Sequence, residues 1–329
     1  MKKILNYLFE HKTFSRENAK EILTNISKGV YNESELAAFM TVFLMRSITI
    51  EELLGFRDAL LELCVPVKLE DNVLDIVGTG GDGKNTFNIS TLSCFLVAGA
   101  GGKVAKHGNY GVSSISGASN VMENLGYKFK NDEGKLKQEM AEAGICFLHA
   151  PLFHPALKNV APVRRQLGVR TFFNMLGPLV NPAFAQHQLI GVYSLEMARI
   201  YNYLFQQTDK RYAIVHSLDG YDEISLTGDT RIITNKGEQD WTPEALGKRK
   251  VHAEDIFGGN TTEDAARIFL KVLKGEGSWA QHSVVMANAA MGLYCLEKYP
   301  TYDECFQAAV ESLESGAAYK VFQKLISLQ

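Results

Sequence analysis

The sequence predicts an α/β protein, with a small N-terminal all-helical domain and a large domain that has a mainly parallel central sheet flanked by helices. Residues 1–65 carry apolar residues at helical spacing and no convincing strand. Beyond residue 66, short apolar runs alternate with helical patterns, which is typical of parallel strands joined by helices. Glycine-rich segments follow two of these runs, at the strand end where ligands bind in such sheets.

Helix starts in the N-terminal region can be read from pairs of polar residues. Asn32 and Thr49 each precede a glutamate by three residues, a spacing in which the two side chains cap the first N–H groups of a helix. The helix after Asn32 is apolar around much of its circumference, so we expect it to pack against other helices or, as the sharper alternative, against a second subunit. Its apolar residues include Phe39, Val42, Phe43 and Met45.

The domain boundary is predicted at the extended segment 65–67, because it contains a proline and the apolar periodicity changes there. Residues 1–65 are the predicted helical domain and carry the predicted dimer surface, and the segment near 160–185 is a candidate to pack with them. Residues 66–329 are the predicted α/β domain. Its strands are predicted at 74–77, 103–105, 146–149, 189–192 and 212–215, and its late helices at 270–275, 283–290 and 306–328.

Composition limits the partners and the location that we expect. The 329 residues are 46% hydrophobic and 22% charged, with a formal net charge of -3 and no basic stretch suited to nucleic acid. No apolar run approaches the roughly 20 residues that cross a bilayer, and the N-terminus lacks a signal-peptide core. Five widely spaced cysteines fit reduced thiols better than disulfides. We expect a cytoplasmic protein that binds neither nucleic acid nor membrane.

The segment 75–91 runs from a short apolar strand into glycines, hydroxyls and one acid. Glycines let backbone N–H groups approach phosphate oxygens, and the following apolar helix, which Ser90 and Thr91 can open, favours an anion at its amino end. Asp82 would repel phosphate, so a sugar hydroxyl, a substrate amine or hydrated Mg²⁺ is its better contact. The segment indicates a phosphate cradle, with an ordinary tight turn as the alternative.

A second polar cluster occupies residues 103–119. A predicted strand leads into Lys106, His107 and Asn109, and the serines and glycines that follow can form another anion-binding nest. A glycine-serine surface loop and a structural histidine are the alternatives. The pairing with the first glycine segment favours a phosphate site that is split between two loops.

Charged residues in two later segments suggest anion and metal recognition. Of the three arginines Arg164, Arg165 and Arg170, we expect one to face a carboxylate or phosphate, and the others to be solvated. Asp222 and Glu223 follow a predicted strand and a glycine, where carboxylates can bind Mg²⁺. An acidic surface turn is the alternative.

Together these motifs resemble the anthranilate phosphoribosyltransferase family, in the same order and over nearly the whole chain. The resemblance implies a fold shared with pyrimidine nucleoside phosphorylases and a homodimer joined through the helical domain. It also implies Mg²⁺, and the substrates anthranilate and 5-phosphoribosyl-1-pyrophosphate in tryptophan biosynthesis. The matching motifs are Gly-Thr-Gly-Gly-Asp at 78–82, Asn-Ile-Ser-Thr at 88–91, Lys-His-Gly-Asn at 106–109, Arg-Arg-Gln-Leu-Gly-Val-Arg-Thr at 164–171 and Asp-Glu at 222–223.

The resemblance implies roles position by position. Asn109 and Arg164 would position the amine of anthranilate, with Arg164 facing its carboxylate. The sequence contains no convincing general base, and His107 is only a weak candidate. Mg²⁺ would be bound by Ser90, Asp222 and Glu223. Anthranilate would be bound by Gly78, Asn109, Arg164, Gly177 and Pro178. The phosphoribosyl donor would be bound by Gly78, Gly81, Asp82, Thr86, Asn88, Ile89, Ser90, Thr91, Lys106, His107, Ser113 and Ser114.

Three positions depart from the family pattern. Tyr110 stands where an arginine is usual, Ile115 where a lysine is usual, and Ala118 where a serine is usual. Two cations and one hydroxyl are therefore missing, and Ser119 is a candidate replacement for the hydroxyl. Two other functions stay open as alternatives: a pyrimidine nucleoside phosphorylase of the same fold, and a non-catalytic family member that binds nucleic acid.

Overall fold

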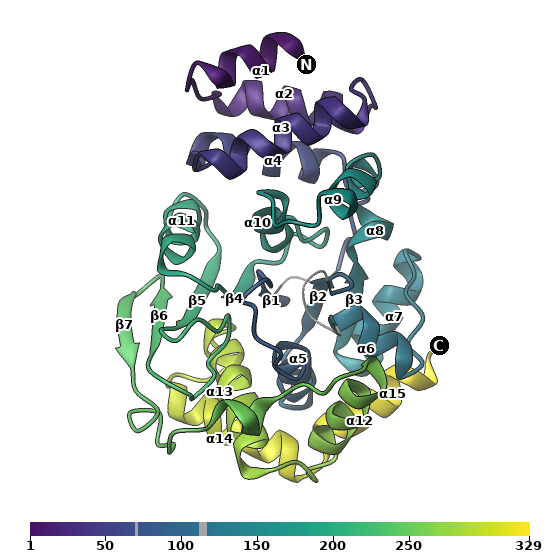
Figure 1. Cartoon of the computed structure of the whole chain (residues 1–329). Coiled ribbons are helices and arrows are strands. Elements are labelled where there is room, and N and C mark those ends of the chain that lie inside the picture. Colours follow the sequence, from purple (N-terminus) through teal and green to yellow (C-terminus); the bar gives the residue numbers. More distant parts are fainter. Residues whose placement is uncertain (70–71, 112–116) are drawn as a thin grey trace. The chain divides into compact units, whose positions relative to one another are not determined.

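The computed structural model describes residues 1–69, 72–111 and 117–329 (Figure 1). The chain forms two compact units, one of residues 1–67 and 150–184 and the other of residues 68–149 and 185–329. Residues 150–184 are thus grouped with the N-terminal helices. The domain boundary at residue 65 stays a prediction, because compactness alone does not show which segment folds by itself.

The first unit is built from short helices. The two helix starts predicted from the sequence are confirmed, because Asn32 and Thr49 each form a reciprocal capping box with the glutamate three residues later. The elements are α1 (Lys2–Phe9), α2 (Arg16–Ser27), α3 (Glu33–Met45), α4 (Ile50–Glu62), α8 (Ala150–Phe153), η1 (Pro155–Leu157), α9 (Ala161–Leu167), α10 (Phe173–Leu176) and η2 (Gly177–Leu179).

Aromatic rings form the centre of this unit. Phe39 and Phe43 of α3 and Phe56 of α4 are buried and surround Phe172, whose ring stacks on that of Phe56 with the centroids 4.8 Å apart. Because Phe172 belongs to the later segment, these contacts join residues 150–184 to α3 and α4. Met45 at the end of α3 is 84% exposed, so the apolar circumference of this helix is buried only in part.

The second unit is built around one sheet. Within the described residues its seven strands have the order β3-β2-β1-β4-β5-β6-β7. The first five in this order are parallel and confirm the five predicted strands, whereas β6 and β7 add antiparallel to one edge and are missed by the sequence pattern. The strands are β1 (Leu74–Gly78), β2 (Val104–Gly108), β3 (Ile145–His149), β4 (His187–Gly191), β5 (Arg211–Ser217), β6 (Thr230–Thr234) and β7 (Gly237–Trp241).

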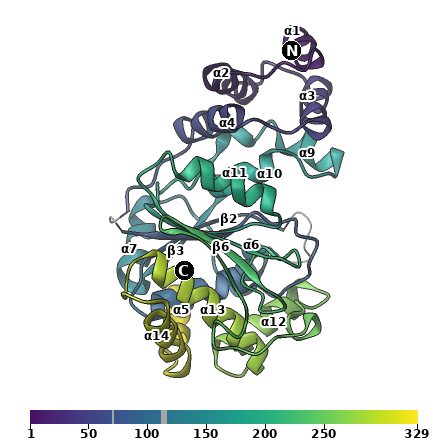
Figure 2. The ribbon, with the colours of Figure 1, turned by 90° about the vertical axis from the view of Figure 1, so that its left-hand side faces the viewer.

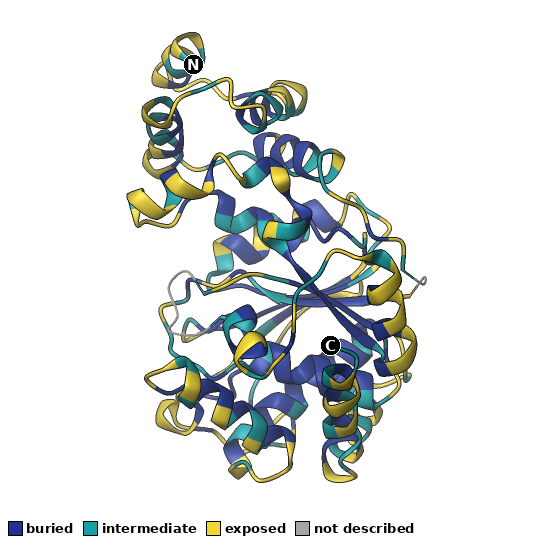
Figure 3. Cartoon of the chain, turned by 90° about the vertical axis from the view of Figure 1, so that its right-hand side faces the viewer, coloured by how far each residue is buried: buried dark blue, intermediate teal, exposed yellow. Residues whose placement is uncertain are grey.

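Helices cover both faces of this sheet. Figure 2 shows α11 on one face and α5 and α13 on the other, and the strands between them are dark blue, hence buried, in Figure 3. The parallel strands place their carboxyl ends at one edge of the sheet, where ligands bind. No helix in the described parts of the chain is long and apolar enough to cross a lipid bilayer. The helices are α5 (Ile89–Gly99), α6 (Ala118–Asn124), α7 (Glu133–Ala143), α11 (Leu195–Phe205), η3 (Ala253–Ile256), α12 (Thr262–Leu273), α13 (Trp279–Cys295), α14 (Tyr302–Glu314) and α15 (Ala317–Ser327).

His154 lies in the interior of the first unit and is 2% exposed. Burial disfavours its charged form and lowers its pKa to about 4, although backbone contacts at Val180 and Leu60 act in the opposite direction. A histidine in an unfolded chain has a pKa of about 6.5. Between these two pH values the unfolded state binds a proton that the folded state does not bind, so stability falls as the pH falls.

We predict that lowering the pH from 7 to 5 removes about 2 kcal/mol of unfolding free energy through His154. Urea unfolding of the wild type and of His154→Gln at both pH values measures this loss, because the variant lacks the titrating ring. His11→Gln changes an exposed histidine and should keep the wild-type pH dependence. The same pH dependence in His154→Gln as in the wild type would contradict the assignment.

Candidate functional site

Three carboxyl groups converge beyond the end of β1. Asp82 lies in the loop 79–88, and Asp222 and Glu223, which are each 8% exposed, follow β5. Burial, followed by the charge of Asp82, raises the pKa of Asp222 to about 7. Burial and the charges of Asp222 and Asp82 raise the pKa of Glu223 well above its usual value. Like charges held this close favour a shared proton or a bound cation.

Hydrogen bonds join the two segments that carry these acids. The N–H of Gly80 donates to Oδ2 of Asp222 at 2.8 Å, across 142 positions of sequence. The hydroxyls of Ser90 and Thr86 donate to the two carboxylate oxygens of Glu223 at 3.1 and 3.4 Å. The predicted phosphate loop and the predicted metal-binding acids are therefore neighbours in one site.

Two glycines make room for Asp222 at the ends of neighbouring strands. Gly78 of β1 is paired with Gly191 of β4. A Cβ on Gly78 would lie 2.5 Å from Oδ2 of Asp222, and a Cβ on Gly191 would lie 1.5 Å from the carbonyl oxygen of Asp222. A side chain on Gly191 would thus displace the acid. The sequence reasoning missed Gly191, although a glycine near the end of a predicted strand is the signal that could have identified it.

The oxygen atoms gathered here fit Mg²⁺, which prefers oxygen ligands and is often bound by one or two carboxylates together with substrate phosphates. Asp222 and Glu223 supply the carboxylates, and Ser90 adds a hydroxyl beside Glu223. Among the described residues, no group of three His, Cys, Asp or Glu side chains surrounds an ion by itself. The arrangement suits a cation that takes its remaining ligands from water and from a phosphorylated substrate.

The loop 79–88 is anchored to residues 256–259. The N–H of Phe87 donates to the carbonyl of Ile256 at 3.1 Å, and the side chain of Asn85 donates to the carbonyl of Gly259 at 2.8 Å. Helix α5 follows and begins at Ile89, one residue before Ser90. Ile89 and Thr91 are buried, and the N–H of Ile89 donates to the carbonyl of Phe87 at 2.6 Å. The backbone N–H of Thr91, in the first turn of α5, is what this residue can offer an anion. Asn88 is the residue that immediately precedes α5.

Strand β2 is longer than predicted, and this changes the position of two candidate residues. Lys106 and His107 lie inside β2 and are buried, instead of following the strand. Nζ of Lys106 donates to the carbonyl of Ile76 at 2.6 Å, and the N–H of His107 donates to Asp75 at 3.1 Å. Asn109 follows the strand and is exposed. The predicted donor contacts Ser113 and Ser114 lie outside the described residues.

Of the three positions predicted to depart from the family pattern, Tyr110 has structural partners. The hydroxyl of Tyr110 donates to Glu123 at 2.7 Å, and its ring meets His149 edge-on. Ala118 is the first residue of α6, and Ile115 lies outside the described residues. Oγ of Ser119 already has a partner, because it lies 2.9 Å from Nδ1 of buried His149. That Ser119 replaces the missing hydroxyl stays a prediction.

Arg164, in the first unit, is held in place by two neighbouring side chains. Its Nη2 donates to Oδ1 of Asn174 at 3.2 Å, and its guanidinium lies over the ring of Phe173. Burial lowers its pKa, whereas Arg165 and Arg170 are exposed. Gly177 and Pro178, also predicted to bind anthranilate, form the 3-10 helix η2 of the same unit. Gly78 and Asn109 belong to the second unit.

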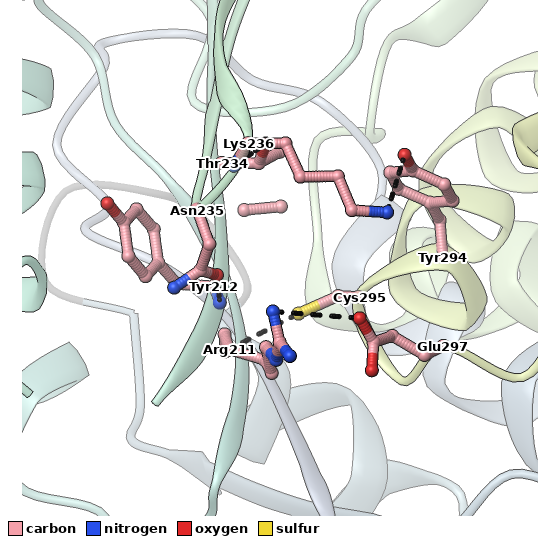
Figure 4. Close-up of a pocket in the computed structure, with 9 residues that line it drawn as sticks. Arg211, Tyr212, Thr234, Asn235, Lys236, Tyr294, Cys295 and Glu297 are labelled. Carbon is pink, nitrogen blue, oxygen red and sulfur yellow. Dashed lines mark hydrogen bonds and ion pairs between the residues drawn. The ribbon is translucent and has the colours of Figure 1, made fainter. Parts of the chain in front are cut away.

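A pocket elsewhere in the second unit is lined by residues of β5, β6 and the end of α13 (Figure 4). Its charged side chains are paired: Arg211 lies 3.7 Å from Glu297, and Lys236 lies 3.4 Å from the hydroxyl of Tyr294. Arg211 begins β5, whereas the acids of the candidate site follow the other end of that strand. The pocket is therefore separate from the acid cluster.

Comparisons with known proteins cover the whole chain. A glycosyl transferase family matches through its helical bundle domain at residues 2–64 and its a/b domain at residues 70–319. The anthranilate phosphoribosyltransferase of Christiangramia forsetii is 58% identical over 100% of this chain and 99% of its own length. That of Bacteroides fragilis is 54% identical with the same coverage.

Solved structures give the same result. The anthranilate phosphoribosyltransferase of Thermus thermophilus superposes with a TM-score of 0.91 at 34% identity, over 98% of both chains. The enzyme of Saccharomyces cerevisiae in complex with PRPP and Mg superposes with a TM-score of 0.87 at 29% identity, over 95% of this chain and 93% of that one.

Proposed function

The chain belongs to the anthranilate phosphoribosyltransferases, within a glycosyl transferase family, and on this basis we propose how its residues carry out the reaction. The enzyme transfers the 5-phosphoribosyl group of 5-phosphoribosyl-1-pyrophosphate to the amine of anthranilate and releases pyrophosphate, in tryptophan biosynthesis. The assignment of the site depends on one observation: Asp222 and Glu223 lie beside the glycine loop that contains Asp82.

The donor is proposed to bind along the loop 79–88, the start of α5 and the end of β2. Backbone N–H groups of the glycine loop and of the helix start would favour the phosphates, and Asp82 would contact the ribose or hydrated metal. Lys106 is buried, so it would act by supporting β1 and β2 beneath the donor. The residues proposed to form the donor site, with Lys106 as its supporting member, are Gly78, Gly81, Asp82, Thr86, Asn88, Ile89, Ser90, Thr91, Lys106, His107, Ser113 and Ser114.

Asp222, Glu223 and Ser90 are proposed to hold Mg²⁺. The yeast relative has been solved with PRPP and Mg. Burial first, and then the charges of the neighbouring acids, raise the pKa values of Asp222 and Glu223, and a cation would stabilise their charged forms. When bound, Mg²⁺ would neutralise the charge that develops on the departing pyrophosphate. The hydroxyls of Ser90 and Thr86 donate to the two carboxylate oxygens of Glu223, which supports the proposal by keeping this carboxylate beside Ser90.

Anthranilate is proposed to be positioned by Arg164 and Asn109. A guanidinium fixed by Asn174 and Phe173 suits the carboxylate of the substrate, and Gly177 and Pro178 would line the same region. A C–N bond forms at the anomeric carbon as its bond to pyrophosphate breaks. The aromatic amine is neutral at pH 7 and can lose its proton late, so positioning is the main contribution and His107 remains the candidate base.

A homodimer joined through the first unit is also proposed. Exposed large apolar side chains support it, since Phe9, Leu44 and Met45 are all accessible on α1 and α3, and such residues often mark an interface. A cytoplasmic location is proposed on chemical grounds. All five cysteines are free thiols, as expected in a reducing compartment.

The assignment can be tested by mixing the protein with anthranilate, the donor and Mg²⁺. We expect the fluorescence of anthranilate to fall as pyrophosphate appears in equal amount. Thymidine with phosphate is the matched test for a nucleoside phosphorylase and should give no free base. Release of thymine without consumption of anthranilate would contradict the proposed reaction.

Replacing Arg164 by alanine should raise the KM for anthranilate about tenfold or more, because a charge-assisted hydrogen bond contributes about 1.5–3 kcal/mol. The KM for the donor should stay within about twofold by the same reasoning. Steady-state kinetics with each substrate varied in turn measures both values. Arg165→Ala removes an exposed arginine from the same helix and should leave both unchanged. An equal rise in both KM values for Arg164→Ala would remove its assigned role.

Replacing Asp222 by asparagine and Glu223 by glutamine should raise the Mg²⁺ concentration that gives half-maximal activity, because both proposed anionic ligands are lost. Activity is measured over a Mg²⁺ titration at saturating anthranilate. Asp229→Asn removes an exposed acid from the same segment and serves as the control. An unchanged Mg²⁺ requirement in the double variant would place the metal elsewhere.

A further inference from the structure

Helix α13 reaches the acid cluster through a buried amide. Asn288 lies in the middle of α13 and is 3% exposed. Its Oδ1 accepts the N–H of Ile224 at 3.0 Å, and its Nδ2 donates to the carbonyl of Ile224 at 2.9 Å. One side chain therefore satisfies both backbone groups of the residue that follows Glu223.

The second N–H of this amide forms a hydrogen bond within its own helix. Nδ2 of Asn288 also donates to the carbonyl of Val284 at 2.9 Å, which fixes the plane of the amide. A buried amide that loses its partners costs about 1–3 kcal/mol, so an asparagine at an otherwise apolar helix position needs such contacts. These contacts specify one position of Ile224 relative to α13.

The strand β5 holds the same segment from another direction. Oγ of Ser217 donates to the carbonyl of Glu223 at 2.6 Å and accepts the N–H of Ser225 at 3.1 Å. Together, Ser217 and Asn288 fix the carbonyl of Glu223 and both backbone groups of Ile224. The side chain of Ile224 is fully buried, so packing also restricts the movement of this residue.

This fixed backbone determines where the two carboxylates can go. Asp222 is confined by Gly78 and Gly191 and accepts the N–H of Gly80, and Glu223 accepts the hydroxyls of Ser90 and Thr86. A shift of Ile224 would move Glu223 away from those hydroxyls, because the residues are consecutive. Repulsion among the acids would favour that shift.

We infer that Asn288 is a positioning residue for the binding of Mg²⁺ and pyrophosphate, acting through the backbone of Ile224 on Glu223. The inference rests on the metal-binding role proposed above for Asp222 and Glu223. Asn288 does not touch a substrate. Its effect should therefore fall on the binding of the donor with its metal, and leave the binding of anthranilate nearly unchanged.

The test compares Asn288→Ala, the milder Asn288→Ser and the control Ser312→Ala. Oγ of Ser312 donates to the carbonyl of Leu96 at 2.8 Å, so the control also removes one buried hydrogen bond from the same unit but lies outside the acid segment. Calorimetric titration of each full-length protein with the donor and Mg²⁺ gives the affinity without turnover. Binding of Mn²⁺ in the presence of the donor, followed by electron paramagnetic resonance, reports on the metal directly.

We expect at least a tenfold weaker affinity for the donor and for Mn²⁺ in both Asn288 variants, with the KM for anthranilate changed less than twofold. Ser312→Ala should lose thermal stability without a change in donor affinity. Wild-type donor affinity in either folded Asn288 variant would overturn the inference, as would an equal loss for both substrates. A wild-type protein that neither binds the donor nor consumes anthranilate would instead overturn the proposed function, and the inference with it.

Discussion

The organisation of this enzyme depends on holding three like charges together at the carboxyl end of a parallel sheet. Asp82, Asp222 and Glu223 repel one another, and their burial increases the cost. Such a cluster persists only if its surroundings leave it no lower-energy arrangement. The glycine pair Gly78 and Gly191, the hydroxyls around Glu223 and the backbone contacts of the acid segment provide that restraint. In the proposed function, a cation that binds together with the phosphorylated donor relieves this repulsion. The repulsion among the three confined acids therefore favours binding of the cation.

The sheet is what makes this confinement possible. β1 and β4 are neighbours in register, so their terminal glycines meet, and β5 lies next to β4 and delivers the acids beside them. Helices α5 and α13 pack on the same face of the sheet, and each contributes one polar group to the cluster's support, Ser90 and Asn288.

Local signals predicted most of this fold, and long-range contacts explain what they missed. The five parallel strands and the capping boxes at Asn32 and Thr49 follow from short patterns, so they could be read from the sequence. β7 could not, because it is an exposed edge strand of mostly polar residues without an apolar alternation. β6 contains β-branched threonines and isoleucines, and this short local signal was overlooked. Lys106 was expected after a strand but lies within β2. The prediction ended this strand too early, because the polar residues Lys106 and His107 interrupt its apolar pattern. The roles of Gly191 and Asn288 could not be predicted, because the residues that they contact are far away in the sequence.

The predicted departures from the family pattern change which groups would neutralise the phosphates of the donor. With fewer basic side chains nearby, the metal held by the acid cluster would contribute more. Tyr110, predicted to stand where the family has an arginine, donates its hydroxyl to Glu123, so in the proposed function it would supply no cation to the donor. Lys84 lies in the glycine loop, but its ammonium rests over the ring of Tyr221. In the proposed function, fewer fixed cations would then neutralise the phosphates of the donor. Neutralisation would depend more on backbone N–H groups of the loop, on the start of α5 and on the metal, whose affinity depends in turn on how firmly Asp222 and Glu223 are held.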